Sequence, residues 1–264
     1  MADLVHDLDL PALARWGTDR IPGALFLTVS GAHLYGFPSA DSDIDLRGAF
    51  LAPLRHLVGL RRPVETVEPK GEFAGIETEA VAHEIGKYLR LLGKDNGYVL
   101  EQVFSPLVVH GADFLARLRP LAALCVTRGC HHHYRGFLQT QLRQLDTQFR
   151  RNTGVRAKTL LYAYRVVLTG IHLLETGEVQ AHLPTLNERF GLDYIPELIR
   201  RKSTAELGTL PCEDVKFHRA ELARWEARLD AAHAACQLPE AAPADAVDEF
   251  LVNLRLGASQ AEQT

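Results

Sequence analysis

The sequence predicts an α+β fold, in which a small mixed β-sheet with flanking helices is followed by an all-helical part. Three observations lead to this expectation. The run Ala24–Val29 is apolar throughout, as in a buried strand. The segments 43–51 and 75–82 alternate between polar and apolar residues, as half-buried strands do. From about residue 112 to residue 256, nearly every segment has helical spacing, interrupted at glycine and proline.

We therefore expect two domains, at residues 1–112 and 113–264. The expected elements of the first domain are helices at 4–20 and 83–92, strands at 24–30, 43–51, 75–82 and 107–110, and a loop or hairpin at 63–75. In the second domain the strongest helix is expected at 155–175, one or two helices at 211–256, and a disordered tail at 257–264.

Composition narrows the class of protein. The chain has 264 residues, of which 47% are hydrophobic and 23% charged, as in ordinary soluble proteins. No apolar run approaches the ~20 residues of a membrane span, and no basic segment followed by an apolar one opens the chain. We expect a cytoplasmic protein without a membrane partner. The cysteines are scattered, as suits a reducing compartment; they are Cys125, Cys130, Cys212 and Cys236. The segment from Cys125 to His133 matches no structural zinc pattern.

Positive charge is concentrated in one segment of a chain whose net charge is −4. Residues 131–170 contain a single acid, Asp146, and several basic residues: Arg135, Arg143, Arg150, Arg151, Arg156, Lys158 and Arg165. A local basic field of this kind suits a polyphosphate or an RNA strand. A solvated helix surface is the other interpretation, and the sequence leaves both open.

A glycine turn and a pair of carboxylates follow the first strand. The turn carries Gly31 and Gly36, and glycine allows a phosphate to approach the backbone closely. Asp43 and Asp45 come next, on one face of the second strand, because side chains alternate along a strand. Crowded carboxylates repel each other, and divalent cations relieve that repulsion. The pattern indicates metal-assisted phosphoryl or nucleotidyl transfer; the alternative is a solvated turn.

These residues suggest a family. The pattern Gly31-Ala32 to Gly36, then a loop, then Ser42-Asp43-Ile44-Asp45 with Leu46-Arg47-Gly48, resembles the polymerase-beta-like nucleotidyltransferase superfamily, and within it the RNA-ligase-associated (RlaP-type) branch. The resemblance spans roughly residues 24–205. It implies that Asp43 and Asp45 are two of three carboxylates that hold two Mg²⁺ ions, or Mn²⁺ in their place, on a nucleoside triphosphate.

The third carboxylate has two candidates on one predicted strand face, Glu77 and Glu79. Of the two, Glu79 has the spacing from the following helix that fits the family better. The family more often has Asp at that position. A second departure is Ala32, where the superfamily usually carries Ser; the N–H groups of Ala32 and His33 remain able to bind phosphate. Both departures keep open the alternative of a catalytically silent nucleotide-binding or interaction module.

One face of the helix at 155–175 carries Lys158, Tyr162 and Arg165. By resemblance, Lys158 and Arg165 match basic residues that recur in the family and would offset triphosphate charge. Tyr35 or Tyr162 would stack on the base. The other interpretation is a surface face of a core helix. The expected nucleotide-binding residues are Ser30, Gly31, Ala32, Tyr35, Gly36, Ser42, Lys158, Tyr162 and Arg165. Arg47 is expected on the aspartate face, balancing charge in the absence of metal or forming a plain ion pair.

The predicted activity is transfer of a nucleoside monophosphate from a nucleoside triphosphate to an acceptor hydroxyl. The resemblance implies an RNA end as acceptor, in RNA repair or processing. Nucleotidylation of a protein or of a small molecule is the alternative within the same enzyme class. The sequence predicts neither the preferred base nor the oligomeric state.

Overall fold

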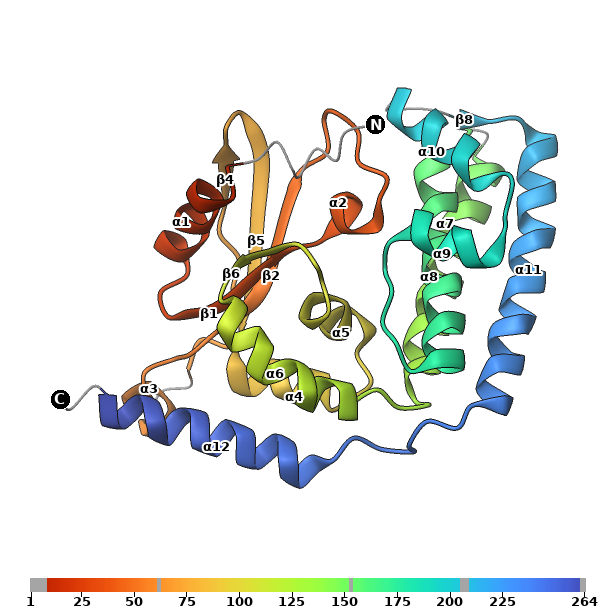
Figure 1. Ribbon diagram of the computed structural model, residues 1–264. Coiled ribbons are helices and arrows are strands. Elements are labelled where there is room, and N and C mark those ends of the chain that lie inside the picture. Colours follow the sequence, from red (N-terminus) through yellow and green to blue (C-terminus); the bar gives the residue numbers. More distant parts are fainter. Residues whose placement is uncertain (1–8, 61–62, 152–153, 205–208, 262–264) are drawn as a thin grey trace. The chain divides into compact units, whose positions relative to one another are not determined.

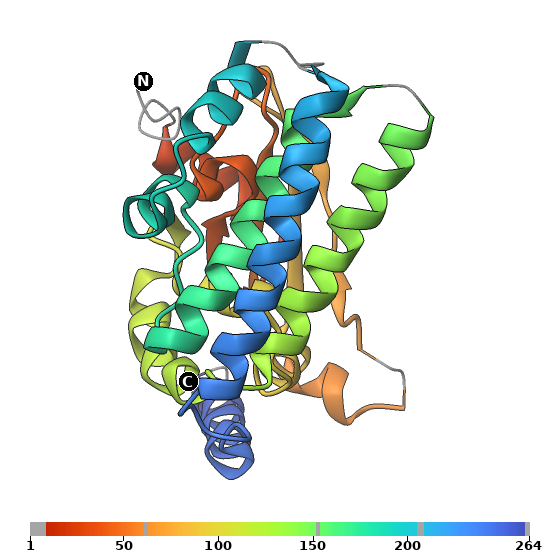
Figure 2. The ribbon, with the colours of Figure 1, turned by 90° about the vertical axis from the view of Figure 1, so that its right-hand side faces the viewer.

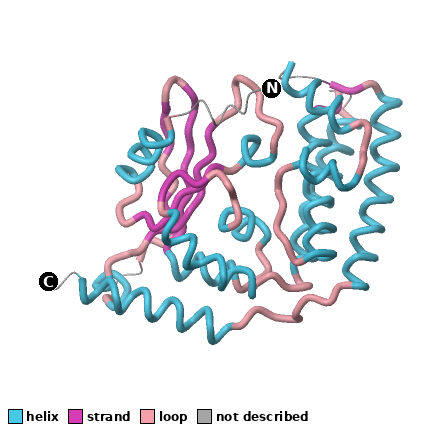
Figure 3. Tube along the Cα trace, in the orientation of Figure 1, coloured by secondary structure: helices cyan, strands magenta, loops and turns pink. Residues whose placement is uncertain are grey.

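The computed structural model describes residues 9–60, 63–151, 154–204 and 209–261. The chain divides into two compact units: the first is Met1–Gly31, Ser42–Cys125 and Ala241–Thr264, and the second is Ala32–Asp41 and Val126–Glu240. The α+β class is confirmed, because a mixed sheet with helices is followed by a mostly helical region (Figures 1 and 3). The functional division at residue 112 stays a prediction.

The sheet of the first unit combines parallel and antiparallel pairs. Its strand order is β3-β5-β2-β1-β6, with β4 also pairing with β5 (Figure 1). Strands β2 and β5 are parallel, and the other pairs are antiparallel. The strands are β1 (Ala24–Val29), β2 (Ile44–Phe50), β3 (Thr66–Val67), β4 (Lys70–Phe73), β5 (Ile76–Glu84) and β6 (Val108–His110). Between β3 and β4, Pro69 contributes its carbonyl oxygen, which accepts a hydrogen bond from the Ala80 N–H at 2.9 Å.

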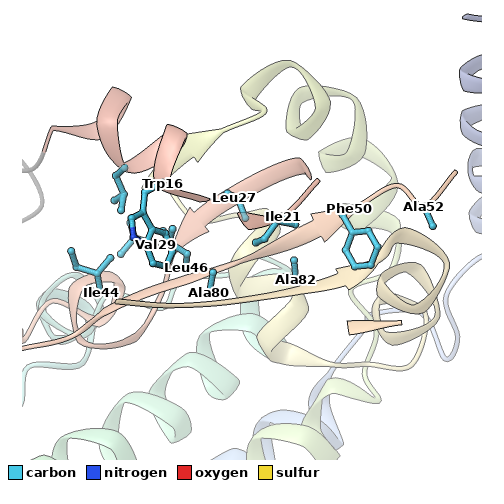
Figure 4. Close-up of a cluster of buried hydrophobic side chains, with 11 residues drawn as sticks. Trp16, Ile21, Leu27, Val29, Ile44, Leu46, Phe50, Ala52, Ala80 and Ala82 are labelled. Carbon is cyan, nitrogen blue, oxygen red and sulfur yellow. The ribbon is translucent and has the colours of Figure 1, made fainter. Parts of the chain in front are cut away.

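Helix α1 (Leu10–Arg20) covers one face of this sheet. Its Asp9 side chain caps the helix by accepting a hydrogen bond from the Ala12 N–H. Leu13 and Trp16 point to the sheet, and the Trp16 indole also donates to the Glu72 carbonyl oxygen of β4 at 3.0 Å. The buried cluster under the helix is drawn from alternate strand positions (Figure 4): Leu27, Val29, Ile44, Leu46, Ala80 and Ala82.

Helices α4 (Ile85–Leu92), α5 (Gly97–Val103) and α6 (Ala112–Leu124) belong to the other face. There the Phe26 ring lies 5.3 Å from Tyr88 and 6.0 Å from Phe114, between ring centroids. Helix α12 (Ala244–Ala261) packs along α4, where Arg255 donates to both oxygens of the buried Glu84 carboxylate, at 2.9 and 3.0 Å. A segment distant in sequence thus completes the first unit. The short α3 (Leu54–Val58) follows β2.

The second unit is built on long helices. Helices α7 (Cys130–Arg150), α8 (Ala157–Thr176) and α11 (Cys212–Ala235) run side by side, with α8 buried along most of its length (Figure 2). Shorter helices, α9 (Leu183–Phe190) and α10 (Ile195–Thr204), pack on α8. Contrary to the all-helical prediction, the strands β7 (Val155–Arg156) and β8 (Thr209–Leu210) form a small antiparallel sheet. Among the described residues, no helix has the length and apolar character needed to cross a bilayer.

Several details differ from the sequence predictions. The helix expected at 4–20 begins at Leu10, and residues 1–8 lie outside the described part of the chain. The predicted disordered tail is wrong for residues 257–261, which continue α12. The short α2 (Gly31–Tyr35) was not expected, because it occupies a glycine turn. The hairpin alternative for 63–75 is confirmed, since β4 turns into β5 through Ala74-Gly75.

Candidate active site

The two central carboxylates lie on the parallel strands β2 and β5. In the register of this pair, Asp45 is opposite Glu79 and Leu46 is opposite Ala80. Leu46 and Ala80 are buried in the core under α1, so the alternation of both strands directs Asp45 and Glu79 to the opposite face. Asp43 precedes β2 by one residue and is exposed. The sequence predicted the shared face of Asp43 and Asp45, and the pairing adds Glu79 beside Asp45.

A guanidinium joins these carboxylates. Arg47, two residues after Asp45 on β2, donates from Nη2 to Asp45 Oδ1 at 2.8 Å and to Glu79 Oε1 at 3.1 Å. Its Nη1 donates to the carbonyl oxygen of Leu46 at 2.9 Å. The prediction that Arg47 occupies the aspartate face is therefore correct. Each of the three ionised side chains is about a quarter to a third exposed.

Sequence reasoning missed a second cation, Lys70. Its Nζ lies 2.7 Å from Glu79 Oε2, because β4 pairs with β5 so that Lys70 is opposite Glu79. The hydrogen bond from Lys70, together with the charge of Arg47, holds the pKa of the Glu79 carboxyl below its ordinary value; the same bond raises the pKa of Lys70. The strand is joined to β5 by the Ala74-Gly75 turn, where both residues have positive φ, as in a type I′ hairpin; of the two, only Gly75 is a residue type that signals such a turn in the sequence.

The glycine turn lies against Asp45. The Ser30 N–H donates to the Asp45 carbonyl oxygen at 2.8 Å, and Gly31 has φ +64°. A Cβ at position 31 would stand 2.1 Å from Asp45 Oδ2, so a side chain is excluded both by backbone conformation and by space. The turn thus brings the end of β1 directly to one of the predicted metal ligands. Ser42, half-buried, precedes Asp43.

The remaining predicted nucleotide-binding residues belong to the second unit. The Arg165 guanidinium lies 4.0 Å from the centroid of the Tyr35 ring, and the Tyr162 ring lies 5.7 Å from that of Tyr35. Arg165 is 1% exposed, whereas Lys158 is exposed. Ala32 is nearly buried in α2. The structure therefore gathers Tyr35, Tyr162 and Arg165 into one aromatic and cationic cluster.

Gly36 and Lys158 have separate surroundings in the same unit. A Cβ on Gly36 would stand 2.4 Å from His182 Nε2, and the backbone has φ +80°, so this position also requires glycine. Near Lys158, a hydrogen bond from Ser39, with the charges of Lys202 and Lys158, lowers the pKa of the Asp41 carboxyl. Lys202 Nζ donates to Ser39 Oγ at 2.7 Å. The nucleotide-binding role of all these residues stays a prediction.

The donor set suits a hard divalent cation, since carboxylate oxygens are the ligands that Mg²⁺ prefers. In the described part of the chain, however, no three His, Cys, Asp or Glu side chains gather as a metal-binding group. The two oxygens of Glu79 are bonded to Arg47 and Lys70. The residues thus fit the metal in chemistry, while the chain's own cations hold Asp45 and Glu79.

The comparisons with known proteins bear on this site. The model of the RlaP family, described as the RNA repair pathway DNA polymerase beta family, matches residues 6–253. The chain belongs to this family. This RlaP-family chain is also 29% identical, over 161 residues, to a protein of Methanocaldococcus jannaschii described as uncharacterized. That match covers 60% of this chain and 63% of the relative, so the chain spans under two thirds of the relative's length.

Among solved structures, the RlaP-family chain is similar to a nucleotidyltransferase-like protein from Exiguobacterium sibiricum 255-15. The identity is 12%, the match covers 88% of this chain and 74% of that one, and the TM-score is 0.32. Membership of the family is the finding that links this chain to nucleotidyltransferases and to an RNA repair pathway.

Proposed function

We propose that this protein is a divalent-cation-dependent nucleotidyltransferase that transfers a nucleoside monophosphate from a nucleoside triphosphate to a hydroxyl at an RNA end. The observation that carries the proposal is the pairing of Asp45 with Glu79 on parallel strands, directly beside the Gly31 turn. Carboxylates that share one face with a phosphate-accessible turn provide the two halves of such a site.

We assign separate roles in metal binding and in phosphate binding to the residues of the first unit and the turn that follows β1. Asp43, Asp45 and Glu79 would hold two Mg²⁺ ions, or Mn²⁺ in their place. These ions would lower the pKa of the attacking hydroxyl and stabilise the negative charge of the leaving pyrophosphate. The N–H groups that follow Gly31 would contact the phosphates, as successive backbone N–H groups of a turn do when they face an anion. Ser42 orients the aspartates or donates to a phosphate oxygen.

The proposed nucleotide contacts of the second unit are Lys158, Tyr162 and Arg165. Lys158 is exposed and able to offset triphosphate charge. Arg165 and Tyr162 both pack on Tyr35, which supports a role in fixing this aromatic cluster around a base rather than a free, solvated face.

RNA is favoured as the acceptor by the charge at one end of α7. Exposed cations lie along the second half of α7, just after it, on β7 and at the start of α8: Arg143, Arg150, Arg151, Arg156 and Lys158. The single acid of this segment, Asp146, is engaged by Arg219 of α11, at 3.1 and 3.3 Å. Phe149 is 39% exposed beside them and offers a ring for base stacking. Phosphodiester charge and unstacked bases together complement this surface.

The ion pairs around Glu79 favour a second candidate, a nucleotide-binding module without catalysis. In that case Arg47 and Lys70 hold the carboxylates permanently, and a triphosphate binds without transfer. Nucleotidylation of a protein or a small molecule would use the same centre with another acceptor.

The test is an incorporation assay with each labelled nucleoside triphosphate, Mg²⁺, and RNA oligonucleotides ending in a hydroxyl or a phosphate. We expect label on the hydroxyl-ended RNA, lost in Asp43→Asn and Asp45→Asn and retained in the control Asp19→Asn, an exposed acid of α1. Unchanged incorporation by Asp45→Asn would falsify the proposal. Calorimetric binding of a triphosphate without any incorporation would favour the second candidate.

A further inference from the structure

One guanidinium nitrogen lies between the two central carboxylates. Arg47 Nη2 is 2.8 Å from Asp45 Oδ1 and 3.1 Å from Glu79 Oε1, and thus bridges neighbouring strands. Strands in a sheet are about 4.8 Å apart, so carboxylates at paired positions repel unless a cation intervenes. Arg47 therefore has the bridging place that a divalent cation would need.

Lys70 completes the neutralisation from the edge of the sheet. It binds the second oxygen of Glu79 at 2.7 Å, and its side chain is 65% exposed, against 23% for Arg47. Two carboxylates and two cations cancel in formal charge. Both oxygens of Glu79 and one oxygen of Asp45 are consequently engaged by the chain itself.

The Arg47 side chain is bound in a way that allows exchange. Its other hydrogen bond runs to the carbonyl oxygen of Leu46, its neighbour on the same strand. Withdrawal of the guanidinium from Asp45 and Glu79 therefore breaks contacts to the candidate site and leaves the packing under α1 intact. A guanidinium released in this way is suited to bidentate contact with phosphate oxygens.

We propose that Arg47 is a positioning residue that acts as an internal counter-cation: it holds Asp45 and Glu79 until a divalent cation replaces it. This inference rests on the proposed nucleotidyltransferase function. A cation alone brings positive charge against Arg47 and Lys70 and binds weakly. A triphosphate brings the negative charge that accepts the released guanidinium, so that metal and triphosphate bind cooperatively.

The experiment measures Mn²⁺ binding by electron paramagnetic resonance, with and without a non-hydrolysable triphosphate. Arg47→Met should bind Mn²⁺ alone about tenfold more tightly than the wild type, from removal of one charge about 5 Å from a divalent ion in water. The added triphosphate should then strengthen Mn²⁺ binding less in Arg47→Met than in the wild type. Lys70→Met, at the exposed edge, should change Mn²⁺ affinity in the same direction. This second variant keeps the test informative if Arg47→Met does not fold.

The matched control is Arg90→Met, which removes an exposed arginine of the same unit that pairs with Glu65. Its Mn²⁺ affinity should equal that of the wild type. Equal or weaker Mn²⁺ binding in both Arg47→Met and Lys70→Met, with normal binding by the wild type in the presence of triphosphate, overturns the exchange and leaves the proposed function standing. Absence of Mn²⁺ binding in every variant, even with triphosphate, overturns the proposed function as well.

Discussion

The carboxylate of Asp45 lies where a side chain on Gly31 would begin. A Cβ at position 31 would be 2.1 Å from Asp45 Oδ2 and 3.1 Å from the carboxyl carbon. The end of β1 and the middle of the candidate site are thereby fitted to each other. Any residue larger than glycine must move either the turn or the carboxylate.

Gly31→Ala should lower the free energy of unfolding and abolish nucleotidyl transfer. The positive φ alone costs Ala about 1–2 kcal/mol, and displacement of Asp45 adds to that cost. The control is Gly75→Ala, which has φ +80° and no atom within 4 Å of the added Cβ. Urea denaturation should show a larger loss for Gly31→Ala. Equal losses of unfolding free energy in the two variants would mean that the Asp45 carboxylate moves aside at no cost.

Glu79→Gln should reduce transfer at least about 100-fold, since it removes a charge proposed to hold the metal. Glu77→Gln should leave transfer unchanged, because Glu77 is exposed and lies opposite Glu72 rather than Asp45. The free energy of unfolding of both variants should lie within about 1 kcal/mol of the wild-type value, because the charges are partly exposed. Steady-state incorporation rates decide between them. A greater loss in Glu77→Gln would assign the third carboxylate to the other glutamate.

Arg151→Ala and Arg156→Ala should each weaken binding to single-stranded RNA and reduce the slope of log affinity against log salt by about 1. Both side chains are exposed. Arg200→Ala is the control, since Arg200 is bonded to Glu197. Fluorescence anisotropy across a salt series measures the slopes. If the control changes as much as the two variants, RNA does not bind at this end of α7.

Acid should destabilise the protein through His133. Burial, reinforced by the charge of Arg165, lowers the pKa of His133 to about 4, from an ordinary value of 6.5. Below pH 6.5 the unfolded chain takes up a proton that the folded chain refuses, so stability falls as pH falls toward 4. Between pH 7 and pH 5 the wild type should lose about 2 kcal/mol more than His133→Gln. Denaturation at the two pH values tests this; parallel losses would contradict it.

Local patterns in the sequence predicted the strands β1, β2, β5 and β6, the shared face of Asp43 and Asp45, and the side of the strand on which Arg47 lies. The register that sets Asp45 opposite Glu79 depends on pairing between strands distant in the chain, which alternation alone does not specify. The position of Lys70 beside Glu79 was not predicted, because its hairpin turn has Ala74 at φ +52°, where Asn or Gly is usual.

The same limit applies to α12. Its residues after 256 are mostly small or polar and resemble a tail, and the packing of α12 on α4 has no signal in the local sequence. The pairing of Arg255 with Glu84 is likewise a tertiary contact without a local signal.

The pairing of Arg255 with Glu84 has a consequence for biosynthesis. The sheet is translated early, yet Arg255, which pairs with its buried Glu84 carboxylate, is made 171 residues later. Until Arg255 leaves the ribosomal exit tunnel, the Glu84 carboxylate of a nascent chain has the N–H of Gly86 as a partner but lacks the guanidinium. Synthesis of α12, and not emergence of the sheet alone, therefore completes the contacts of this carboxylate.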